Sequence, residues 1–369
     1  MSEFSVFDEA AMRRALELAE RGLYSTHPNP RVGAVLARDN EIVGEGWHQR
    51  PGEAHAEPIA IRAAGERARG ATAYVTLEPC NHFGRTPPCV DVLLAVGVRR
   101  VVYAIGDPNP LVNGSGAQRL REAGVQVESG LLAREAAALN AGFLMRMTRG
   151  RPFVRLKSAA SLDGRTALAN GASQWITSEE ARADVQHWRA QSGAVLASAA
   201  TVLADNPRLD VRIATSRQPL RVVLDRRRQV RRSARILAPP GDVLLFAAAR
   251  LGSREGSARE ERLGAARIER VRTLRGHLDL QRVFTRLGEL EINDVLVEAG
   301  PRLAGALLAA GLVDEWLLYL APKLLGSDAK PLARLAPLTK LAAAPQFAIL
   351  DSRPVGSDLR LRMQPVAGK

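Results

Sequence analysis

The chain has 369 residues, which is too long for one ordinary hydrophobic core and predicts two domains of the usual size. The sequence contains no run of 18 uncharged apolar residues, so we expect no membrane span. The N-terminal segment carries acidic side chains and lacks the apolar core of a signal peptide. We therefore expect a cytoplasmic protein, in which a lone structural disulfide between the two cysteines is improbable.

The net charge of +13 is concentrated in the second half of the chain. Residues 1–148 hold 16 Lys and Arg against 17 Asp and Glu, whereas residues 149–369 hold 36 against 22. One interpretation is a nucleic-acid-binding patch centred on the basic segment 221–237. The other is a solvated arginine-rich surface. We favour the second, because this region has few aromatic side chains on which bases could stack.

Helices and strands are expected to alternate in the first half. Met12, Ala15, Leu16 and Ala19 recur at helical spacing and predict an amphipathic helix near the N-terminus. Residues 31–48 predict two strands joined by a turn at Asp39 and Asn40. The pattern then predicts helix, strand, helix, strand, helix and strand, over residues 55–66, 71–79, 87–97, 99–107, 115–124 and 125–130. Such alternation is typical of an α/β sandwich.

Gly150 and Pro152 interrupt this pattern and predict a domain boundary, which gives one domain over residues 1–148 and another over residues 149–369. Alternation resumes in the second domain, apart from a charged, exposed helix or loop expected around residues 250–265. An apolar strand is predicted to end at Glu298, before a Gly-Pro turn and a helix. Backbone amides at such a turn can bind an anion.

His55, Cys80 and Cys89 form a candidate zinc site. An imidazole and two thiolates leave one of zinc's four tetrahedral positions for water. Glu57 lies two residues after His55, within reach of that water, as in zinc nucleobase deaminases. Eight residues separate the cysteines, a wider gap than in a C-x-x-C site, so His82 remains an alternative ligand. Two buried cysteines with an unrelated histidine are the structural alternative.

The residues before Cys89 predict its local structure. Thr86 can cap a helix whose first positions are Pro87 and Pro88, which places Cys89 in the first helical turn. The positive end of the helix dipole favours a thiolate there.

Four segments of the first half carry a resemblance to a known family: NPRVGAVL, HAEPIAI, TLEPCNHFGRTPPC and DPNPLVNGSG. They closely resemble the deaminase half of the bifunctional deaminase–reductases of riboflavin biosynthesis. The resemblance implies a cytidine-deaminase-like α/β/α domain with one Zn²⁺ per chain. It implies that water attacks the ring carbon bearing an amine, that ammonia leaves, and that Glu57 transfers the protons. Asn29, His48, His82 and Arg85 are the candidate substrate-binding residues, although Asn29 and His48 could instead only order their loops.

Four further segments resemble the reductase half of the same family: KSAASLDGRTALANGASQWIT, ATVLADNPRLDVR, PLRVVLD and LVEAGPRLAGALLAAGLVDEWLLYLAPKLLG. The resemblance implies a dihydrofolate-reductase-like α/β domain that uses NADPH. Its motifs imply a cofactor site lined by Ala159, Trp175, Thr201, Asp205, Gly300, Pro301, Arg302, Leu303, Ala304, Gly305 and Ala306. The residues expected to contact the substrate are Lys157, Ser173, Arg189, Leu209, Arg212 and Glu298.

Each reductase assignment has a simpler alternative or a departure from the family. Trp175 could be a core residue, and Asp205 could belong to a turn. Ser198 and Ala200 stand where many relatives carry glycines, and Ala299 replaces a common glycine. Small-for-small changes of this kind should be tolerated, and they bear on the reductase rather than on the deaminase.

The sequence as a whole predicts a bifunctional enzyme that acts on phosphorylated pyrimidines, without nucleic acid or membrane partners. One rival is a nucleoside or tRNA deaminase whose basic C-terminal domain binds RNA. Another is a non-catalytic scaffold stabilised by zinc. A homodimer is a further expectation, with the apolar strand in residues 315–322 as a candidate interface.

Overall fold

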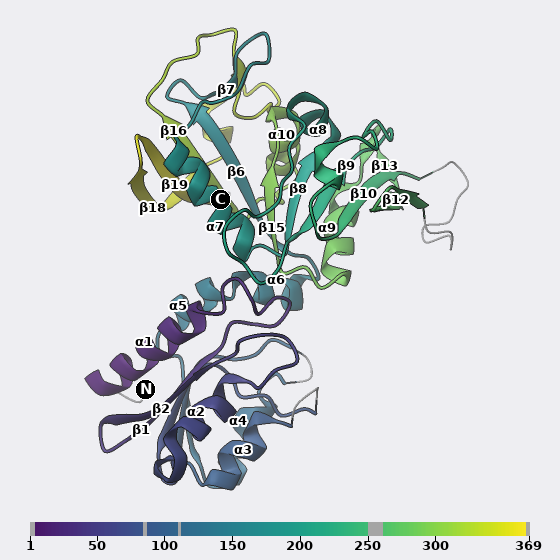
Figure 1. The fold of residues 1–369 in the computed structure, drawn as a ribbon. Helices are drawn as coiled ribbons and strands as arrows, with labels where there is room; N and C mark the ends of the chain where they lie inside the picture. Colours follow the sequence, from purple (N-terminus) through teal and green to yellow (C-terminus); the bar gives the residue numbers. More distant parts are fainter. Residues whose placement is uncertain (1–3, 84–86, 110–111, 250–260, 367–369) are drawn as a thin grey trace. The chain divides into compact units, whose positions relative to one another are not determined.

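The computed structural model describes the chain except for residues 1–3, 84–86, 110–111, 250–260 and 367–369. The chain divides into two compact units, Met1–Gly150 and Arg151–Lys369. Within the described ranges, no helix has both the length and the apolar character needed to cross a bilayer. Figure 1 shows that each unit is built on its own twisted sheet.

The first unit is a three-layer sandwich around a five-stranded sheet. The sheet order is β2-β1-β3-β4-β5, with β1 antiparallel to its neighbours and β3, β4 and β5 parallel. The strands are β1 Gly33–Arg38, β2 Glu41–Trp47, β3 Thr72–Leu77, β4 Arg100–Ile105 and β5 Gln126–Ser129. One face packs on α1 Val6–Glu20 and α5 Ala133–Leu139. The other packs on α2 Ala56–Ala64, α3 Cys89–Val96 and α4 Ser115–Glu122.

Short segments complete this unit, and the ends of its helices and strands can be compared with those predicted. A 3₁₀ turn, Gly65–Ala68, follows α2, and α6 Ala141–Arg149 ends the unit. Asp39 and Asn40 form the predicted turn with positive φ values of 51° and 59°, which suit the twist of a two-residue hairpin. Helix α3 starts later than predicted, because Pro88 is its N-cap and Cys89 its first residue. The predicted cap, Thr86, lies outside the described residues.

The second unit contains a ten-stranded mixed sheet, ordered β11-β12-β10-β9-β8-β15-β6-β16-β19-β18. The strands from β12 to β16 in this order are parallel, and the ends of the sheet are antiparallel. The parallel strands are β6 Phe153–Ser161, β8 Ala194–Ser198, β9 Leu220–Leu224, β10 Val243–Ala248, β12 Ala266–Val271, β15 Asp294–Glu298 and β16 Glu315–Ala321. The others are β11 Glu261–Leu263, β18 Phe347–Val355 and β19 Asp358–Pro365.

Helices cover both faces of this sheet. One face packs on α9 Leu280–Glu289 and α10 Pro301–Ala309, and the other on α7 Glu179–Gln191 and α8 Ala199–Asp205. The remaining short elements are β7 Arg165–Ala167, β17 Lys330–Pro331, β13 Thr273–Leu274, β14 His277–Leu278 and 3₁₀ turns at Arg235–Leu237 and Leu341–Ala343. The fold class predicted from the sequence is confirmed in both units.

Two expectations for the second unit are wrong. Residues 261–263 form the edge strand β11, where the sequence predicted a helix or loop, because they pair with β12; residues 250–260 lie outside the described part. The strand expected to form a subunit interface, β16, lies between β6 and β19 and is almost fully buried. Its apolar character is therefore explained by the core of its own unit.

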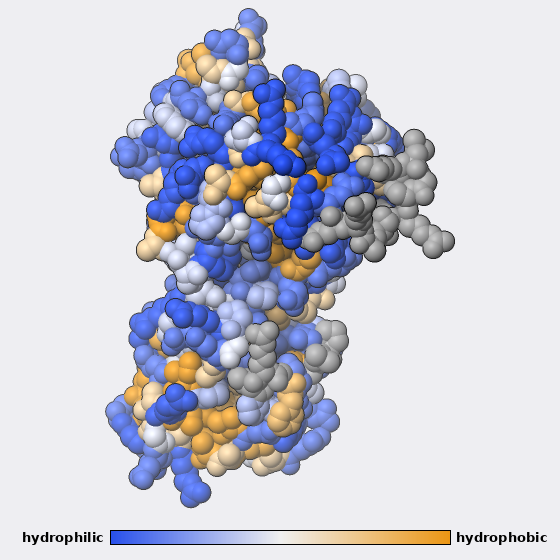
Figure 2. All heavy atoms as spheres, turned by 45° about the vertical axis from the view of Figure 1, so that its right-hand side comes forward, coloured by the Kyte–Doolittle hydropathy of each residue, from blue (hydrophilic) through white to orange (hydrophobic). Residues whose placement is uncertain are grey.

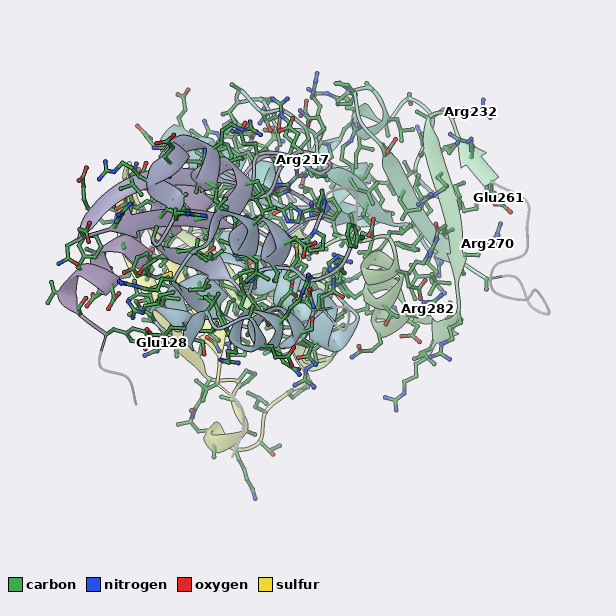
Figure 3. All side chains as sticks on the ribbon, turned by 90° about the horizontal axis from the view of Figure 1, so that it is seen from below. Glu128, Arg217, Arg232, Glu261, Arg270 and Arg282 are labelled. Carbon is green, nitrogen blue, oxygen red and sulfur yellow. The ribbon has the colours of Figure 1, made fainter. Side chains whose placement is uncertain are left out.

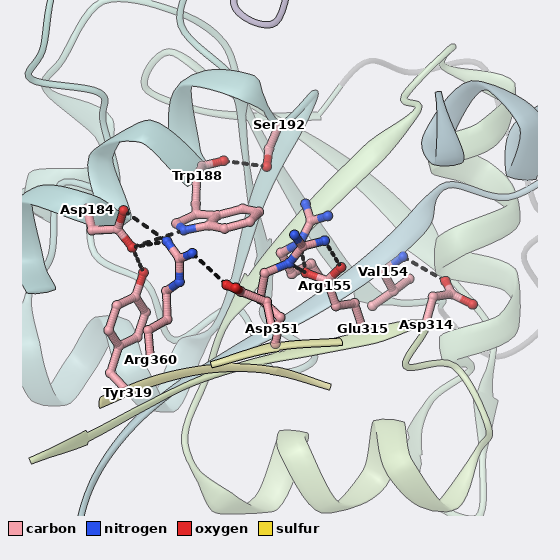
Figure 4. A network of polar contacts seen from close by, with 11 residues as sticks. Val154, Arg155, Asp184, Trp188, Ser192, Asp314, Glu315, Tyr319, Asp351 and Arg360 are labelled. Carbon is pink, nitrogen blue, oxygen red and sulfur yellow. Dashed lines mark hydrogen bonds and ion pairs between the residues drawn. The ribbon is translucent and has the colours of Figure 1, made fainter. Parts of the chain in front are cut away.

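A polar network joins α7 to the sheet (Figure 4). The ring of Trp188 lies 4.6 Å from the guanidinium of Arg155, and its Nε1 donates to Asp184 at 3.2 Å. Arg155 donates to Glu315 at 2.6 Å, and Arg360 donates to Asp184 at 2.9 Å. These buried charges are paired, which is the condition under which a folded core tolerates them.

Many arginines of the basic half are used inside the unit. The guanidinium of Arg221 is buried and donates to four backbone carbonyls. Arg270 lies beside Glu261 at the β11–β12 edge (Figure 3), with N–O distances of 2.9–3.1 Å. Arg282 pairs with Glu289 at 2.6 Å. Hydrophilic side chains cover most of the visible face (Figure 2), as expected for a solvated surface. The positive charge is therefore partly structural and partly dispersed.

Candidate active sites

The predicted metal ligands come together at the ends of three elements of the first unit. His55 is the N-cap of α2, Cys80 follows β3, and Cys89 begins α3. His55 Nδ1 lies 3.2 Å from Cys89 Sγ and 3.5 Å from Cys80 Sγ, and the three donor atoms lie within 4.8 Å of one another. A tetrahedral zinc ion with ordinary bond lengths separates such ligand atoms by roughly 3.5–3.8 Å. The donor set therefore fits zinc, and His82 is not part of this group.

The two thiols of the metal-free chain shift each other's pKa in opposite directions, and each must become a thiolate to bind zinc. A hydrogen bond from Cys89, opposed by burial and helped by His55, lowers the pKa of Cys80 to about 4. The same Cys80 interaction, together with burial, raises the pKa of Cys89 well above its usual value. The hydrogen bond to Cys80 also raises the pKa of His55. A zinc ion bound here would supply Lewis acidity, which lowers the pKa of a bound water.

Glu57 lies in the first turn of α2, where only 3% of its surface is exposed. Burial, together with the nearby Cys80 sulfur, raises the pKa of its carboxyl group. A buried carboxyl group with a raised pKa is suited to accept a proton and return it. Its position next to His55 puts this proton carrier beside the cluster without making it a ligand.

The substrate-binding candidates of the first unit are only partly assembled. His48 Nδ1 lies 3.1 Å from the Ala54 carbonyl, so it is the protonated nitrogen, and Nε2 accepts from Asn29 Nδ2 at 3.0 Å. The His48 ring packs edge-on against His55, with ring centres 5.4 Å apart. The buried Nδ1 of His82 has no hydrogen-bond partner among the described residues. Arg85 lies outside the described residues.

The sequence reasoning missed two buried carboxylates beside the cluster. Glu78 follows β3 directly and accepts from the backbone amides of Gly114 at 3.0 Å, Ala117 at 3.1 Å and Asp107 at 3.4 Å. Asp107 follows β4, and burial raises its pKa to about 6, with His82 and Cys80 among the charges that act on it. The sequence signal that could have identified them is an acidic residue one or two positions after an apolar strand.

The predicted substrate residues of the reductase form an ionic cluster in the second unit. Lys157 on β6 and Glu298 on β15 are register partners. Arg189 of α7 donates to both carboxylate oxygens of Glu298, at 2.6 and 3.0 Å. Burial opposes ionisation of Glu298, but the charges of Arg189, Lys157 and Arg212 outweigh it and lower its pKa to about 2. Burial lowers the pKa of Lys157.

The remaining substrate candidates are less connected. Leu209 is buried among apolar residues near α7 and α8. Ser173 is half-buried in the segment between β7 and α7. No hydrogen bond joins either side chain to the Glu298 cluster in the described structure.

The cofactor candidates lie on or just after three neighbouring strands, β6, β15 and β8. Ala159 lies on β6, and Gly300 caps α10 with Pro301 at its first position, leaving Arg302 and Leu303 in the first turn. Thr201 lies in α8, where its amide donates to Ser198 Oγ at 3.3 Å. Since the carboxyl ends of parallel strands meet at one edge, these segments gather there.

Other cofactor candidates serve packing or local structure. Ala304 is fully buried, and Gly305 packs against the backbone of Arg334, where a Cβ would lie 1.9 Å from a carbonyl oxygen. The following residue, Ala306, is exposed. Asp205 ends α8 before a left-handed Asn206, and burial raises its pKa. Trp175 is 63% exposed, so the alternative that it is a core residue is wrong.

The fold and the sites define a class of protein: an enzyme that joins a zinc-dependent deaminase to a reductase. The family model for the cytidine and deoxycytidylate deaminase zinc-binding region matches residues 5–105, and the model for the RibD C-terminal domain matches residues 152–361. The riboflavin biosynthesis protein RibD of Escherichia coli K12 is 54% identical, with 96% of this chain and 99% of that protein covered. The Haemophilus influenzae RibD is 45% identical over 99% of both chains.

Solved structures agree with the family models. Acinetobacter baumannii RibD has a TM-score of 0.88 at 46% identity, and covers 98% of this chain and 99% of its own. A Thermotoga maritima protein, described as a diaminohydroxyphosphoribosylaminopyrimidine deaminase/5-amino-6-(5-phosphoribosylamino)uracil reductase, has a TM-score of 0.86 at 34% identity and the same coverage. This chain belongs to the RibD family of riboflavin biosynthesis. It is a bifunctional enzyme with a zinc-dependent deaminase and an NADPH-dependent reductase, and the RNA-binding alternative is not favoured.

Proposed function

We propose that residues 1–148 deaminate 2,5-diamino-6-ribosylamino-4(3H)-pyrimidinone 5′-phosphate by hydrolysis. The observation that carries this proposal is the buried Glu57 carboxyl group beside the cluster of His55, Cys80 and Cys89. Glu57 takes a proton from water as it attacks the ring carbon and returns that proton to the leaving amine.

The ring of the substrate is held by polar groups with fixed orientations. Because Asn29 donates its amide hydrogen to His48, its carbonyl oxygen is left as an acceptor for a substrate N–H. His82 offers its Nδ1, which has no partner within the part of the chain that the structure describes, and Arg85 is the fourth substrate-binding candidate.

We propose that residues 149–369 then reduce 5-amino-6-(5-phosphoribosylamino)uracil to the ribityl product with NADPH. The supporting observation is the cluster of Lys157, Arg189, Arg212 and Glu298, in which three positive charges face one carboxylate. A guanidinium such as that of Arg212 suits the oxygens of the substrate's 5′-phosphate. Hydride transfer belongs to the cofactor, and the chain aligns the cofactor with the sugar carbon.

The experiment is to give the purified enzyme the diamino pyrimidine, with and without NADPH, and to follow ammonia and ribityl product. The proposal predicts ammonia release in both cases and ribityl product only with NADPH. Ammonia release that requires NADPH would contradict the order of the two reactions.

We also propose that the enzyme is a homodimer that works in the cytoplasm. The support for a dimer comes from β18 rather than from β16. β18 is an edge strand of the sheet, and its side chains Ile349 and Leu350 are exposed. The support for the compartment is that Cys80 and Cys89 are unbonded thiols, which zinc binding requires to remain reduced. Sedimentation analysis tests the dimer, and Ile349→Lys should dissociate it.

A further inference from the structure

Trp175 presents an indole ring with one covered face and one open face. The ring is 63% exposed, whereas Trp188 and Trp316 are 8% and 9% exposed in the same unit. The guanidinium carbon of Arg182, on α7, lies 4.6 Å from the centre of the Trp175 ring. An exposed indole with one face covered leaves its other face open for stacking on a second ring.

Hydrogen bonds hold the Arg182 side chain and the Trp175 backbone in place. Arg182 donates to the carbonyl oxygen of Thr177 at 2.7 Å, which fixes the guanidinium at the start of α7. The ammonium group of Lys323 donates to the carbonyl oxygens of Trp175 at 3.2 Å and Ile176 at 2.9 Å. Arg182 forms no ion pair with a carboxylate in the described part of the chain, so its charge is directed at the indole.

Lys323 connects this segment to the end of the sheet where the reductase site lies. It follows β16, and its carbonyl oxygen accepts from the Leu162 amide just beyond β6. In the β6–β16 ladder, Lys157 and Ala159 pair with Leu317 and Tyr319. Trp175 is thus tied to the carboxyl end of the β6–β16 strand pair, five residues beyond Lys157 along β6.

We propose that Arg182 is a positioning residue that backs the Trp175 indole, so that the open face stacks on the nicotinamide ring of NADPH. This inference rests on the proposed reductase site and adds a residue to it. A guanidinium over one face holds the ring flat and strengthens it as a stacking platform. The nicotinamide is the ring at this end because hydride must pass to a substrate held by Lys157 and Glu298.

The same charge discriminates between the two redox states of the cofactor. The nicotinamide of NADPH is neutral, whereas that of NADP⁺ carries a positive charge. A guanidinium on the far side of the indole repels that charge across roughly 8 Å, which at an effective dielectric constant near 20–40 corresponds to about a fivefold or larger preference for NADPH. Arg182 therefore assists release of the oxidised cofactor after hydride transfer.

The test compares Arg182→Gln, Arg182→Lys and Trp175→Phe in the full-length enzyme. NADPH quenching of tryptophan fluorescence reports the stacking, and the difference between the parent enzyme and Trp175→Phe isolates the Trp175 signal. Equilibrium titration gives the dissociation constants of NADPH and NADP⁺. Arg282→Gln is the matched control. Arg282 and its partner Glu289 both lie on α9, away from the α7 helix that carries Arg182.

We expect Arg182→Gln to weaken NADPH binding about fivefold and to shrink the preference for NADPH over NADP⁺ by a similar factor. Arg182→Lys should restore most of the preference, because it keeps the charge, but less of the affinity, because it loses the planar stack. Ammonia release should be unchanged in every variant. If Arg182 has only a structural role, Arg182→Gln should lower the stability of the enzyme and leave the ratio of the NADPH and NADP⁺ dissociation constants unaltered.

Three other outcomes separate the inference from the function on which it rests. Failure of the parent enzyme to bind NADPH would overturn the reductase site itself. NADPH binding without quenching from Trp175 would remove this tryptophan from the cofactor site. Quenching from Trp175 with both dissociation constants unchanged in Arg182→Gln would overturn the role of Arg182 alone. If Arg182→Gln does not fold, the ratio of the NADPH and NADP⁺ dissociation constants in Arg182→Lys becomes the test. An Arg182→Lys variant that binds NADPH like the parent enzyme but no longer prefers it over NADP⁺ would contradict a role for the charge.

Discussion

Glu298 and Arg189 form a two-point ion pair in which Nε and Nη2 of the guanidinium donate to separate carboxylate oxygens, at 2.6 and 3.0 Å. The pair joins β15 to α7, and Lys157 is the register partner of Glu298 on β6. An arginine fork fixes both the position and the plane of a carboxylate, which a lysine cannot do. The fork therefore fixes the Glu298 carboxylate, which we propose lies at the substrate end of the reductase.

Arg189→Lys tests this alignment. The variant keeps the positive charge but loses the second hydrogen bond, so we expect kcat/KM of the reductase to fall by about tenfold to 100-fold. Ammonia release should stay within twofold of the parent enzyme, because Arg189 belongs to the other unit. Arg286→Lys, at a partly buried pair with Glu269 and an exposed pair with Glu289, is the control and should leave both activities unchanged. A parent-like reductase in Arg189→Lys would contradict the role of the fork.

Glu57→Gln tests proton transfer in the deaminase. The amide cannot take a proton from water, so ammonia release should fall by about 100-fold to 10,000-fold. Zinc content should remain that of the parent enzyme, because Glu57 lies outside the group of ligand atoms. Metal analysis and the ammonia assay on the same sample provide the check. Loss of zinc together with activity would instead make Glu57 a structural residue.

Glu78→Gln tests whether the missed carboxylate organises the deaminase site. The carboxylate accepts from three backbone amides, and an amide side chain can satisfy only part of that demand. Leaving one or two buried N–H groups without acceptors costs about 1–3 kcal/mol each, so the first unit should unfold at lower denaturant. Ammonia release should fall while NADPH oxidation persists. Glu122→Gln, on the exposed side of α4, is the control.

Glu315→Gln tests the acid stability of the second unit. Burial disfavours the charge of Glu315, but Arg155 and Arg362 outweigh it and lower its pKa from 4.5 to about 2. Because the folded-state pKa is the lower one, the pair stabilises the fold above pH 4.5, and this stability is lost as the pH falls from 4.5 toward 2. The shift corresponds to about 3 kcal/mol.

The variant should lose that pH dependence and be less stable at neutral pH, since two arginines are left without their carboxylate. Denaturant unfolding at several pH values between 3 and 7 provides the measurement. Glu289→Gln, at a partly exposed pair, should change the free energy of unfolding by less than about 0.5 kcal/mol. An unaltered slope in Glu315→Gln would contradict the assignment of the acid transition to this residue.

Local patterns predicted much of the fold and of the metal site. His55, Glu57, Cys80 and Cys89 were identified because zinc chemistry restricts both the residue types and their number. The Asp39–Asn40 turn was predicted because few residues adopt positive φ readily. The second unit was harder, since its sheet pairs strands far apart in sequence, such as β6 with β15. Periodicity alone gives no such pairing.

The errors have physical causes as well. The apolar strand β16 suggested an interface because a strand buried inside a sheet and one buried between subunits have the same composition. Glu78 was overlooked because its partners are backbone amides about 30 to 40 residues away, which leave no side-chain signature. Arg182 was overlooked because contact with Trp175 depends on the loop that precedes α7.

We expect the zinc site of the first unit and the NADPH site of the second to work independently of each other. The most direct measurement removes zinc by chelation and then assays both reactions on the same sample, with the deaminated intermediate supplied for the reductase. We predict that ammonia release is lost and returns when zinc is added back, while NADPH oxidation continues at the parent rate throughout. Loss of NADPH oxidation on zinc removal, or ammonia release that persists without zinc, would contradict the account.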